Sequence, residues 1–187
     1  MQIPIIISLV LSATTLPSIS PTTQQELFQQ SNSISFFKSK NTLKSIYLQS
    51  NKNHTFYCGC SFDTNKQIDH DSCNYSPRIK SNKRSHRLEF EHIVPAHALG
   101  KNLQCWKKPI CEKRNGKKYK GRKCCSKISD EYKQMQSDMH NLFPAVGEVN
   151  GDRSNFIFGE IYGEERKYGQ CDFEVAERIA EPKKSIR

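Results

Sequence analysis

Residues 87–97 read Arg87-Leu-Glu-Phe-Glu-His-Ile-Val-Pro-Ala-His97, which places two carboxylates and two imidazoles within one short stretch. Apolar and polar side chains alternate through its first half, and this is the pattern of a half-buried strand. Pro95 cannot donate to a strand ladder, so the strand should stop before it. Glu91 and His92 are therefore expected at a strand end, where polar side chains can reach a cleft. The side chains expected to face the core are Leu88, Phe90 and Val94.

The N-terminus has the composition of an export signal. Its first twenty residues contain no Asp, Glu, Lys or Arg, and an apolar run from Ile3 to Leu11 ends in small residues. The run is too short to span a bilayer, and Ser18-Ile-Ser20 is a small-x-small cleavage site. A buried N-terminal strand or a membrane anchor is the alternative. We expect residues 1–20 to be a signal peptide and residues 21–187 to form one domain, without a membrane span, in the periplasm or outside the cell.

The cysteine content indicates disulfides. Eight cysteines follow the predicted signal, and an even number in an exported chain predicts up to four bridges. Structural zinc is the alternative, but it usually relies on Cys-x-x-Cys pairs, which the sequence lacks. Spacing alone does not give the pairing. The cysteines are Cys58, Cys60, Cys73, Cys105, Cys111, Cys124, Cys125 and Cys171.

The chain is strongly basic, with a formal net charge of +10, and much of this charge lies between residues 107 and 127. Each cation that neutralises a phosphate releases a condensed counterion, so this segment is suited to bind nucleic acid without sequence preference. A solvated loop kept soluble by its charge explains the same composition equally well. The segment contains one acidic residue, Glu112. Its basic residues are Lys107, Lys108, Lys113, Arg114, Lys117, Lys118, Lys120, Arg122, Lys123 and Lys127.

Secondary structure is predicted for four further segments. Residues 129–140 should form a helix that Ser129 caps, and residues 32–49 should be helical in their second half. Residues 175–186 also read as a helix. The stretch 57–60 suggests a strand pinned by a disulfide. The inner face of the helix at 129–140 is expected to carry Tyr132, Met135 and Met139.

Several longer blocks keep a fixed order along the chain. They are Arg87-x-Glu-Phe-Glu-His-x-Val-Pro-Ala, Cys105-Trp106, Gly121-Arg-Lys123, Asp138-Met-His-Asn-Leu-x-Pro-Ala-Val-Gly-Glu-Val-Asn-Gly-Asp-Arg-Ser-Asn-Phe156, Tyr168-Gly-x-Cys171 and Ala180-Glu-Pro182. In these blocks the chain resembles the bacterial endonuclease I family of periplasmic and secreted nucleases. Phe90 stands where the family has tryptophan, and the loop between Trp106 and Gly121 is longer and more basic. Family members run on for several further helices, so the C-terminal part of the domain is expected to be missing.

This resemblance implies an α+β fold, a disulfide-stapled, mixed α/β single domain with a ββα-metal (His-Me finger) active site. It implies a sequence-nonspecific endonuclease that hydrolyses the phosphodiester bonds of DNA, and often of RNA. The implied cofactor is a divalent cation, Mg²⁺ or in its place Mn²⁺ or Ca²⁺. We expect a monomer that has DNA, and also RNA, as its partner.

The resemblance also assigns candidate site residues. His92 matches the general base, since a neutral imidazole can take a proton near neutral pH. Arg122 matches the catalytic arginine that clamps phosphate, because a guanidinium grips two phosphate oxygens. Glu91 and Asn141 match the metal ligands, and hard oxygen donors with several retained waters suit magnesium.

Other polar residues carry weaker interpretations. Glu89 is either a carboxylate that orients a neighbouring ligand or an exposed strand residue. His140 is a candidate to orient Asn141. Glu148 and Asn150 are interpreted as structural, since turn-rich polar segments hydrogen-bond their own backbone. Two alternative functions stay open: a catalytically inactive, truncated remnant that binds nucleic acid, and a cysteine-rich binder of proteins or polyanions.

Overall fold

The computed structural model describes residues 34–163 and 165–186, and the predicted signal peptide lies outside the described residues. Residues Ser33–Arg187 cluster as one compact unit. The α-helices are α2 (Phe36–Gln49), α3 (Ala96–Gly100), α4 (Gln104–Lys107), α5 (Arg122–Ile128), α6 (Asp130–Ser137) and α7 (Gly147–Arg153). The 3₁₀ turns are η1 (Asp71–Cys73), η2 (Lys83–His86) and η3 (Met139–Asn141). The strands are β1 (Leu88–His92), β2 (Cys111–Glu112), β3 (Lys118–Tyr119), β4 (Leu142–Val146), β5 (Ile157–Phe158), β6 (Phe173–Ala176) and β7 (Ile179–Pro182).

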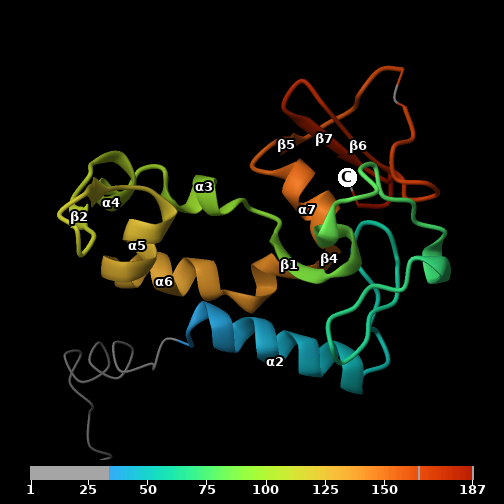
Figure 1. Cartoon of the computed structure of the whole chain (residues 1–187), viewed down its shortest axis with the longest axis horizontal. Coiled ribbons are helices and arrows are strands. Elements are labelled where there is room, and N and C mark those ends of the chain that lie inside the picture. The colour runs from blue at the N-terminus through green and yellow to red at the C-terminus, as the bar shows by residue number, and fades with distance from the viewer. Residues whose placement is uncertain (1–33, 164, 187) are drawn as a thin grey trace, which may run out of the picture. The chain divides into compact units, whose positions relative to one another are not determined.

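The unit that carries the quoted motif is a strand pair followed at once by a helix. Strand β1 pairs with β4 in antiparallel register, from Leu88 opposite Val146 to His92 opposite Leu142. Helix α7 starts directly after β4 and packs back on both strands (Figure 1). Gly147 permits this close return, since a Cβ there would lie 2.6 Å from the carbonyl oxygen of Arg84.

Both faces of β1 are covered, which a strict alternation of apolar and polar residues did not predict. Leu88 and Phe90 are buried as expected, but Glu91 and His92 are also only 3% and 5% exposed. The face that carries Glu91 lies against α7, and the ring of Phe36 in α2 lies 5.2 Å from the His92 ring. The motif therefore buries two titratable side chains.

The end of β1 agrees with the prediction and corrects one detail of it. The strand stops at His92, ahead of Pro95, as predicted. Val94 was expected to face the core, but it is 49% exposed because it follows the end of the strand.

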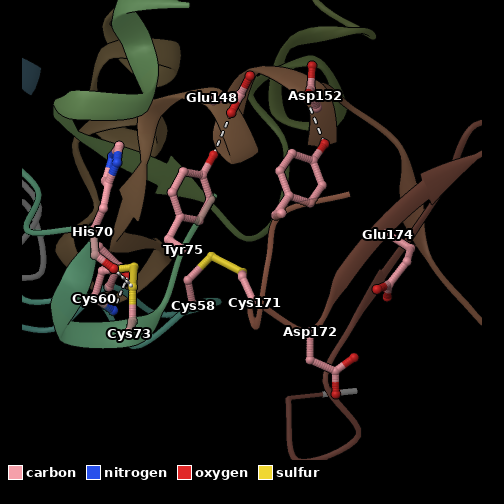
Figure 2. The surroundings of a disulfide bond; sticks show 12 residues. Cys58, Cys60, His70, Cys73, Tyr75, Glu148, Asp152, Cys171, Asp172 and Glu174 are labelled. Carbon is pink, nitrogen blue, oxygen red and sulfur yellow. Dashed lines mark hydrogen bonds between the residues drawn. A yellow bond between two sulfur atoms is a disulfide. The ribbon is translucent and has the colours of Figure 1, made fainter. Parts of the chain in front are cut away.

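All eight cysteines form disulfides, so the prediction of four bridges is confirmed and the zinc alternative is wrong. Figure 2 shows the bridge that ties the early loop to the C-terminal region beside a second, local bridge. The pairs are Cys58–Cys171, Cys60–Cys73, Cys105–Cys125 and Cys111–Cys124.

The early loop also braces α7. From this loop Tyr75 donates its hydroxyl to Glu148 (Figure 2), and from the C-terminal region Tyr168 donates to Asp152 at 2.7 Å. The Glu148 carboxylate accepts further bonds from the backbone N–H groups of Arg78 and Ile79 and from the side chain of Asn82, so its structural interpretation is confirmed.

Two predicted elements are wrong and two are right. Residues 175–186 were predicted as a helix, but they form the hairpin of β6 and β7 and the turn after it. Residues 57–60 are a turn rather than a strand, although Cys58 is bridged. Helix α6 begins as predicted, with the Ser129 hydroxyl accepting from the Tyr132 N–H, but it ends at Ser137 instead of His140, and the separate 3₁₀ turn η3 follows. Helix α2 starts at Phe36 and so fills more than the second half of the segment predicted for it.

A second, smaller core lies among α3, α4, α5 and α6. Its buried residues are Tyr132 and the four cysteines of two bridges, and Trp106 packs against them. The β2–β3 hairpin belongs to this region and is drawn beside α5 in Figure 1. No helix in the described ranges is long and apolar enough to cross a membrane.

Candidate active site

One cavity of about 490 Å³ brings together three of the four predicted site residues. Glu91 and His92 reach it from the end of β1, and Arg122 reaches it from the start of α5. Helix α7 contributes Asn150 and Arg153 to the same wall. The cavity is therefore built where the strand–strand–helix unit meets the second core.

His92 is held in a single tautomer. Its Nε2 lies 2.9 Å from the backbone oxygen of Gln136 in α6, and only a protonated ring nitrogen can donate to a carbonyl. Nδ1 is then the unprotonated nitrogen of the neutral ring. Burial lowers the pKa of His92 to about 4, and the nearby cations Arg122 and Lys40 add to the effect against the Gln136 hydrogen bond. The imidazole is consequently neutral at physiological pH.

Glu91 forms a buried ion pair with the last residue of α7. Arg153 is 2% exposed, and its guanidinium lies 2.8 Å from Oε1 of Glu91, an atom that also accepts from the Tyr57 hydroxyl at 3.2 Å. Burial raises the pKa of Glu91 to about 7, and Arg153 and Tyr57 partly oppose it. A second cation near this carboxylate would favour its charged form.

Asn150 is oriented by a charged neighbour. Its Nδ2 donates to Oε2 of Glu89 at 2.8 Å, and a carboxylate can only accept, so Oδ1 of the amide is the free oxygen acceptor. Glu89 is in turn gripped by Arg84 and Arg87, with N···O distances of 2.6 Å. Burial alone would raise the pKa of Glu89, but these hydrogen bonds hold it below its usual value. Of the two interpretations of Glu89, the orienting one therefore agrees with its contacts.

Arg122 lies where two surface cavities meet. It is the first residue of α5, directly after Gly121, and its side chain is exposed. It lines the 490 Å³ cavity together with a neighbouring cavity of about 720 Å³ over β1. Its guanidinium lies 5.4 Å from the ring centroid of Phe36, which fixes it over α2.

Asn141 does not line the 490 Å³ cavity. Its side-chain amide accepts from the Val94 N–H at 2.7 Å and donates to the Val94 oxygen at 3.0 Å, so both polar atoms are used in closing the strand pair. It lines a different, smaller cavity beside His140. His140 is 98% exposed and bonds Asp138, so it does not orient Asn141. The structure thus does not bring Asn141 to Glu91 and His92.

The residue that sequence reasoning missed is Asn150. Glu148 and Asn150 were interpreted as structural residues of a turn-rich polar segment, in which Asn150 had no reason to face a site. As a helix, the same segment places Asn150 and Arg153 three residues apart on one face. The signal that would have revealed this helix is Gly147, which directly follows the buried strand β4 and is the first residue of α7.

A family model described as Endonuclease I matches residues 17–187. The chain belongs to the endonuclease I family, as the sequence blocks indicated.

Individual relatives agree with this membership. The chain is 46% identical over 137 residues to an extracellular deoxyribonuclease of Aeromonas hydrophila, a match that covers 71% of this chain and 55% of that protein. A periplasmic deoxyribonuclease of the same organism is 45% identical, with 71% and 53% covered. Endonuclease-1 of Buchnera aphidicola subsp. Acyrthosiphon pisum (strain APS) is 38% identical, with 86% and 64% covered. The chain thus spans little more than half the length of the curated relatives it matches.

Proposed function

We propose that this chain is a sequence-nonspecific endonuclease that hydrolyses phosphodiester bonds of DNA, and of RNA as a second substrate. The observation that carries the proposal is one cavity that joins a neutral imidazole, a carboxylate and an exposed guanidinium, from His92, Glu91 and Arg122. Hydrolysis needs a water made nucleophilic and charge neutralised on the phosphoryl oxygens. Membership of the endonuclease I family, with relatives named deoxyribonucleases, supports the same reaction.

In this proposal His92 is the general base and Arg122 holds the phosphate. Nδ1 of His92 takes the proton from the attacking water, while Nε2 keeps its own proton, donates it in a hydrogen bond to the Gln136 oxygen and so holds the ring in place. The guanidinium of Arg122 pairs with two phosphoryl oxygens, which positions the phosphorus in the cavity. The low pKa of His92, about 4, keeps the base unprotonated over the working pH range.

The donor set of the cavity fits a hard divalent cation, and Mg²⁺ is the one proposed, with Mn²⁺ and Ca²⁺ as substitutes. Glu91 offers a carboxylate whose contacts to Tyr57 and Arg153 both fall on Oε1, and Asn150 offers the oriented oxygen Oδ1. Among the described residues, no three His, Cys, Asp or Glu side chains gather as metal ligands. One carboxylate and one amide suit a cation that keeps several waters. When bound, such an ion supplies neutralisation of phosphate and leaving-group charge.

The two candidate asparagines give opposite predictions. Asn150→Ala should reduce Mg²⁺-dependent cleavage by about 100-fold and raise the Mg²⁺ concentration for half-maximal rate, since it removes an oriented oxygen donor. Asn141→Ala should leave the Mg²⁺ dependence unchanged and lower the melting temperature, because it removes two bonds that close the strand pair. Titration of the cleavage rate with Mg²⁺ measures the first effect, and a thermal melt measures the second. A shifted Mg²⁺ dependence in Asn141→Ala would return Asn141 to the metal site.

Plasmid nicking tests the function itself. The purified chain should convert supercoiled DNA of unrelated sequences to open circles with Mg²⁺ and stop when a chelator is in excess. Binding without nicking under all metal conditions would favour the inactive nucleic-acid-binding remnant. Full activity in excess chelator would remove the metal from the mechanism.

We also propose a periplasmic or extracellular location. Two relatives carry these words in their names, and four disulfides persist best in an oxidising compartment. The expectation that the protein acts as a monomer stays a prediction.

A further inference from the structure

We propose that the β2–β3 hairpin is a second DNA-binding surface, which contacts backbone phosphates of duplex DNA beyond the bond that is cut. This inference rests on the proposed function. It assigns a partner to the basic segment, for which the sequence left DNA binding and simple solubility equally open.

The hairpin has a defined shape. Cys111 pairs with Tyr119 and Glu112 with Lys118, and the Lys113 N–H donates to the Lys117 oxygen at 3.0 Å to close the turn. Gly116 adopts φ +76°, the left-handed conformation that this turn requires. The basic side chains therefore project from a fixed backbone rather than from an irregular loop.

Two disulfides fix the hairpin to the candidate active site. Cys111 is bonded to Cys124, and Cys105, just ahead of the hairpin, is bonded to Cys125. Both partners lie in the first turns of α5, whose first residue is Arg122. A segment that served only to keep the protein soluble would need no fixed position relative to the phosphate-holding residue.

The charge around Arg122 forms a continuous path. A cavity of about 620 Å³ on the hairpin side exposes six cations against the single acid Glu112. Arg122 and Lys123 also line the 720 Å³ cavity over β1, together with Lys40 and Lys66 and with Arg87, which pairs with Glu89, the acid of that cavity. The six cations of the hairpin side are Lys113, Arg114, Lys120, Arg122, Lys123 and Lys127.

The cations at the hairpin tip are available to a ligand. Within residues 34–163 and 165–186, Lys113, Arg114, Lys117 and Lys118 are exposed, and none of them forms an ion pair with a carboxylate. A row of unpaired cations that leads away from the cut site matches the regular negative charge of a duplex backbone. Short substrates that end within the cavity would not reach them.

The test compares two variants that lose the same positive charge. The hairpin variant carries Lys113→Gln, Arg114→Gln, Lys117→Gln and Lys118→Gln. The control carries Lys52→Gln, Lys80→Gln, Lys83→Gln and Lys184→Gln, at exposed positions that line none of these three cavities. Thermal melts establish that both variants fold.

Binding of the full chain to duplex DNA of roughly 30 base pairs is measured by fluorescence anisotropy in chelator, across a range of salt. The hairpin variant should bind about 10- to 100-fold more weakly, and its plot of log affinity against log salt should be shallower by about two to four. The control should bind within about threefold of the natural chain. Equal affinities and slopes for the two variants would overturn the inference.

A second measurement separates this inference from the proposed function. The hairpin variant should cleave a substrate of about four nucleotides at the natural rate, while KM for plasmid DNA rises and kcat does not fall. If the unsubstituted protein binds duplex DNA through the hairpin but does not cut it, the proposed function is wrong and the inference about the hairpin stands. A hairpin variant that loses kcat on the short substrate would show that the hairpin acts at the cut site and contradict its role as a second surface.

Discussion

His92→Ala is expected to lower the rate of phosphodiester cleavage by about 100- to 10,000-fold, the contribution typical of a positioned general base. DNA affinity should change little, because the exposed cations proposed to bind the DNA backbone are untouched. The loss of rate is expected because Nε2 of His92 donates to the Gln136 oxygen and the low pKa keeps Nδ1 unprotonated, so that Nδ1 is the nitrogen that can act as the base. Single-turnover nicking measures the rate, and anisotropy in chelator measures the affinity.

His140→Ala is the matched control for this experiment. His140 is almost fully exposed and, among the described residues, its side chain bonds Asp138 alone, so its loss should leave cleavage within about threefold of the natural rate. A thermal melt of His92→Ala separates lost chemistry from lost packing against Phe36. Full activity in a folded His92→Ala would remove His92 from the mechanism.

Arg153→Met is expected to lower the free energy of unfolding by about 3–5 kcal/mol, the usual effect of leaving a buried charge without its partner. Glu91 would keep one neutral donor, Tyr57, in place of a guanidinium. The backbone oxygens of His92 and Ile93 would lose their donors as well. Urea unfolding, with the disulfides intact and followed by the fluorescence of the single tryptophan, Trp106, measures the change.

Two further variants test whether the loss of stability arises from the buried pair of Glu91 and Arg153. Arg78→Met removes an arginine from a partly exposed pair with Asp152, which keeps the Tyr168 hydroxyl as a donor, and its effect should be about 1 kcal/mol. The double variant Glu91→Gln with Arg153→Met should be much less destabilised than the sum of its two single variants, because neither partner is left charged and alone. Additive effects, or equal losses in Arg153→Met and Arg78→Met, would contradict the assigned role of Arg153.

The sequence was sufficient where chemistry is encoded locally. Pro95 predicts where β1 stops, Ser129 predicts the start of α6, and the even cysteine count predicts complete pairing. The quoted motif likewise placed Glu91 and His92 at a strand end. The strand end and the helix start depend on neighbours in the chain, and the cysteine pairing depends on a count that the sequence gives directly.

The C-terminal hairpin and the position of Asn150 depend on long-range packing, which the sequence does not show. The C-terminal hairpin turns at Glu177 and Arg178, both with positive φ, where tight hairpins normally use Asn or Gly. With no such signal, residues 175–186 read as a helix. The position of Asn150 followed from the return of α7 onto β1, a long-range contact, whereas Asn141 was assigned from the family resemblance.

The adjacency of Cys124 and Cys125 has a consequence for how the protein matures. Neighbouring side chains on a helix point about 100° apart, so Cys124 and Cys125 leave α5 in different directions. The bonds from Cys105 to Cys125 and from Cys111 to Cys124 therefore set the rotation of α5 about its own axis. Exchange of the two partners would preserve the number of bonds but require the helix to rotate, and Arg122 would turn away from the cavity with it. A fully oxidised population can therefore contain a mispaired isomer in which Arg122, the proposed phosphate clamp, is out of position, and the absence of free thiols is not a sufficient criterion of a correctly matured protein.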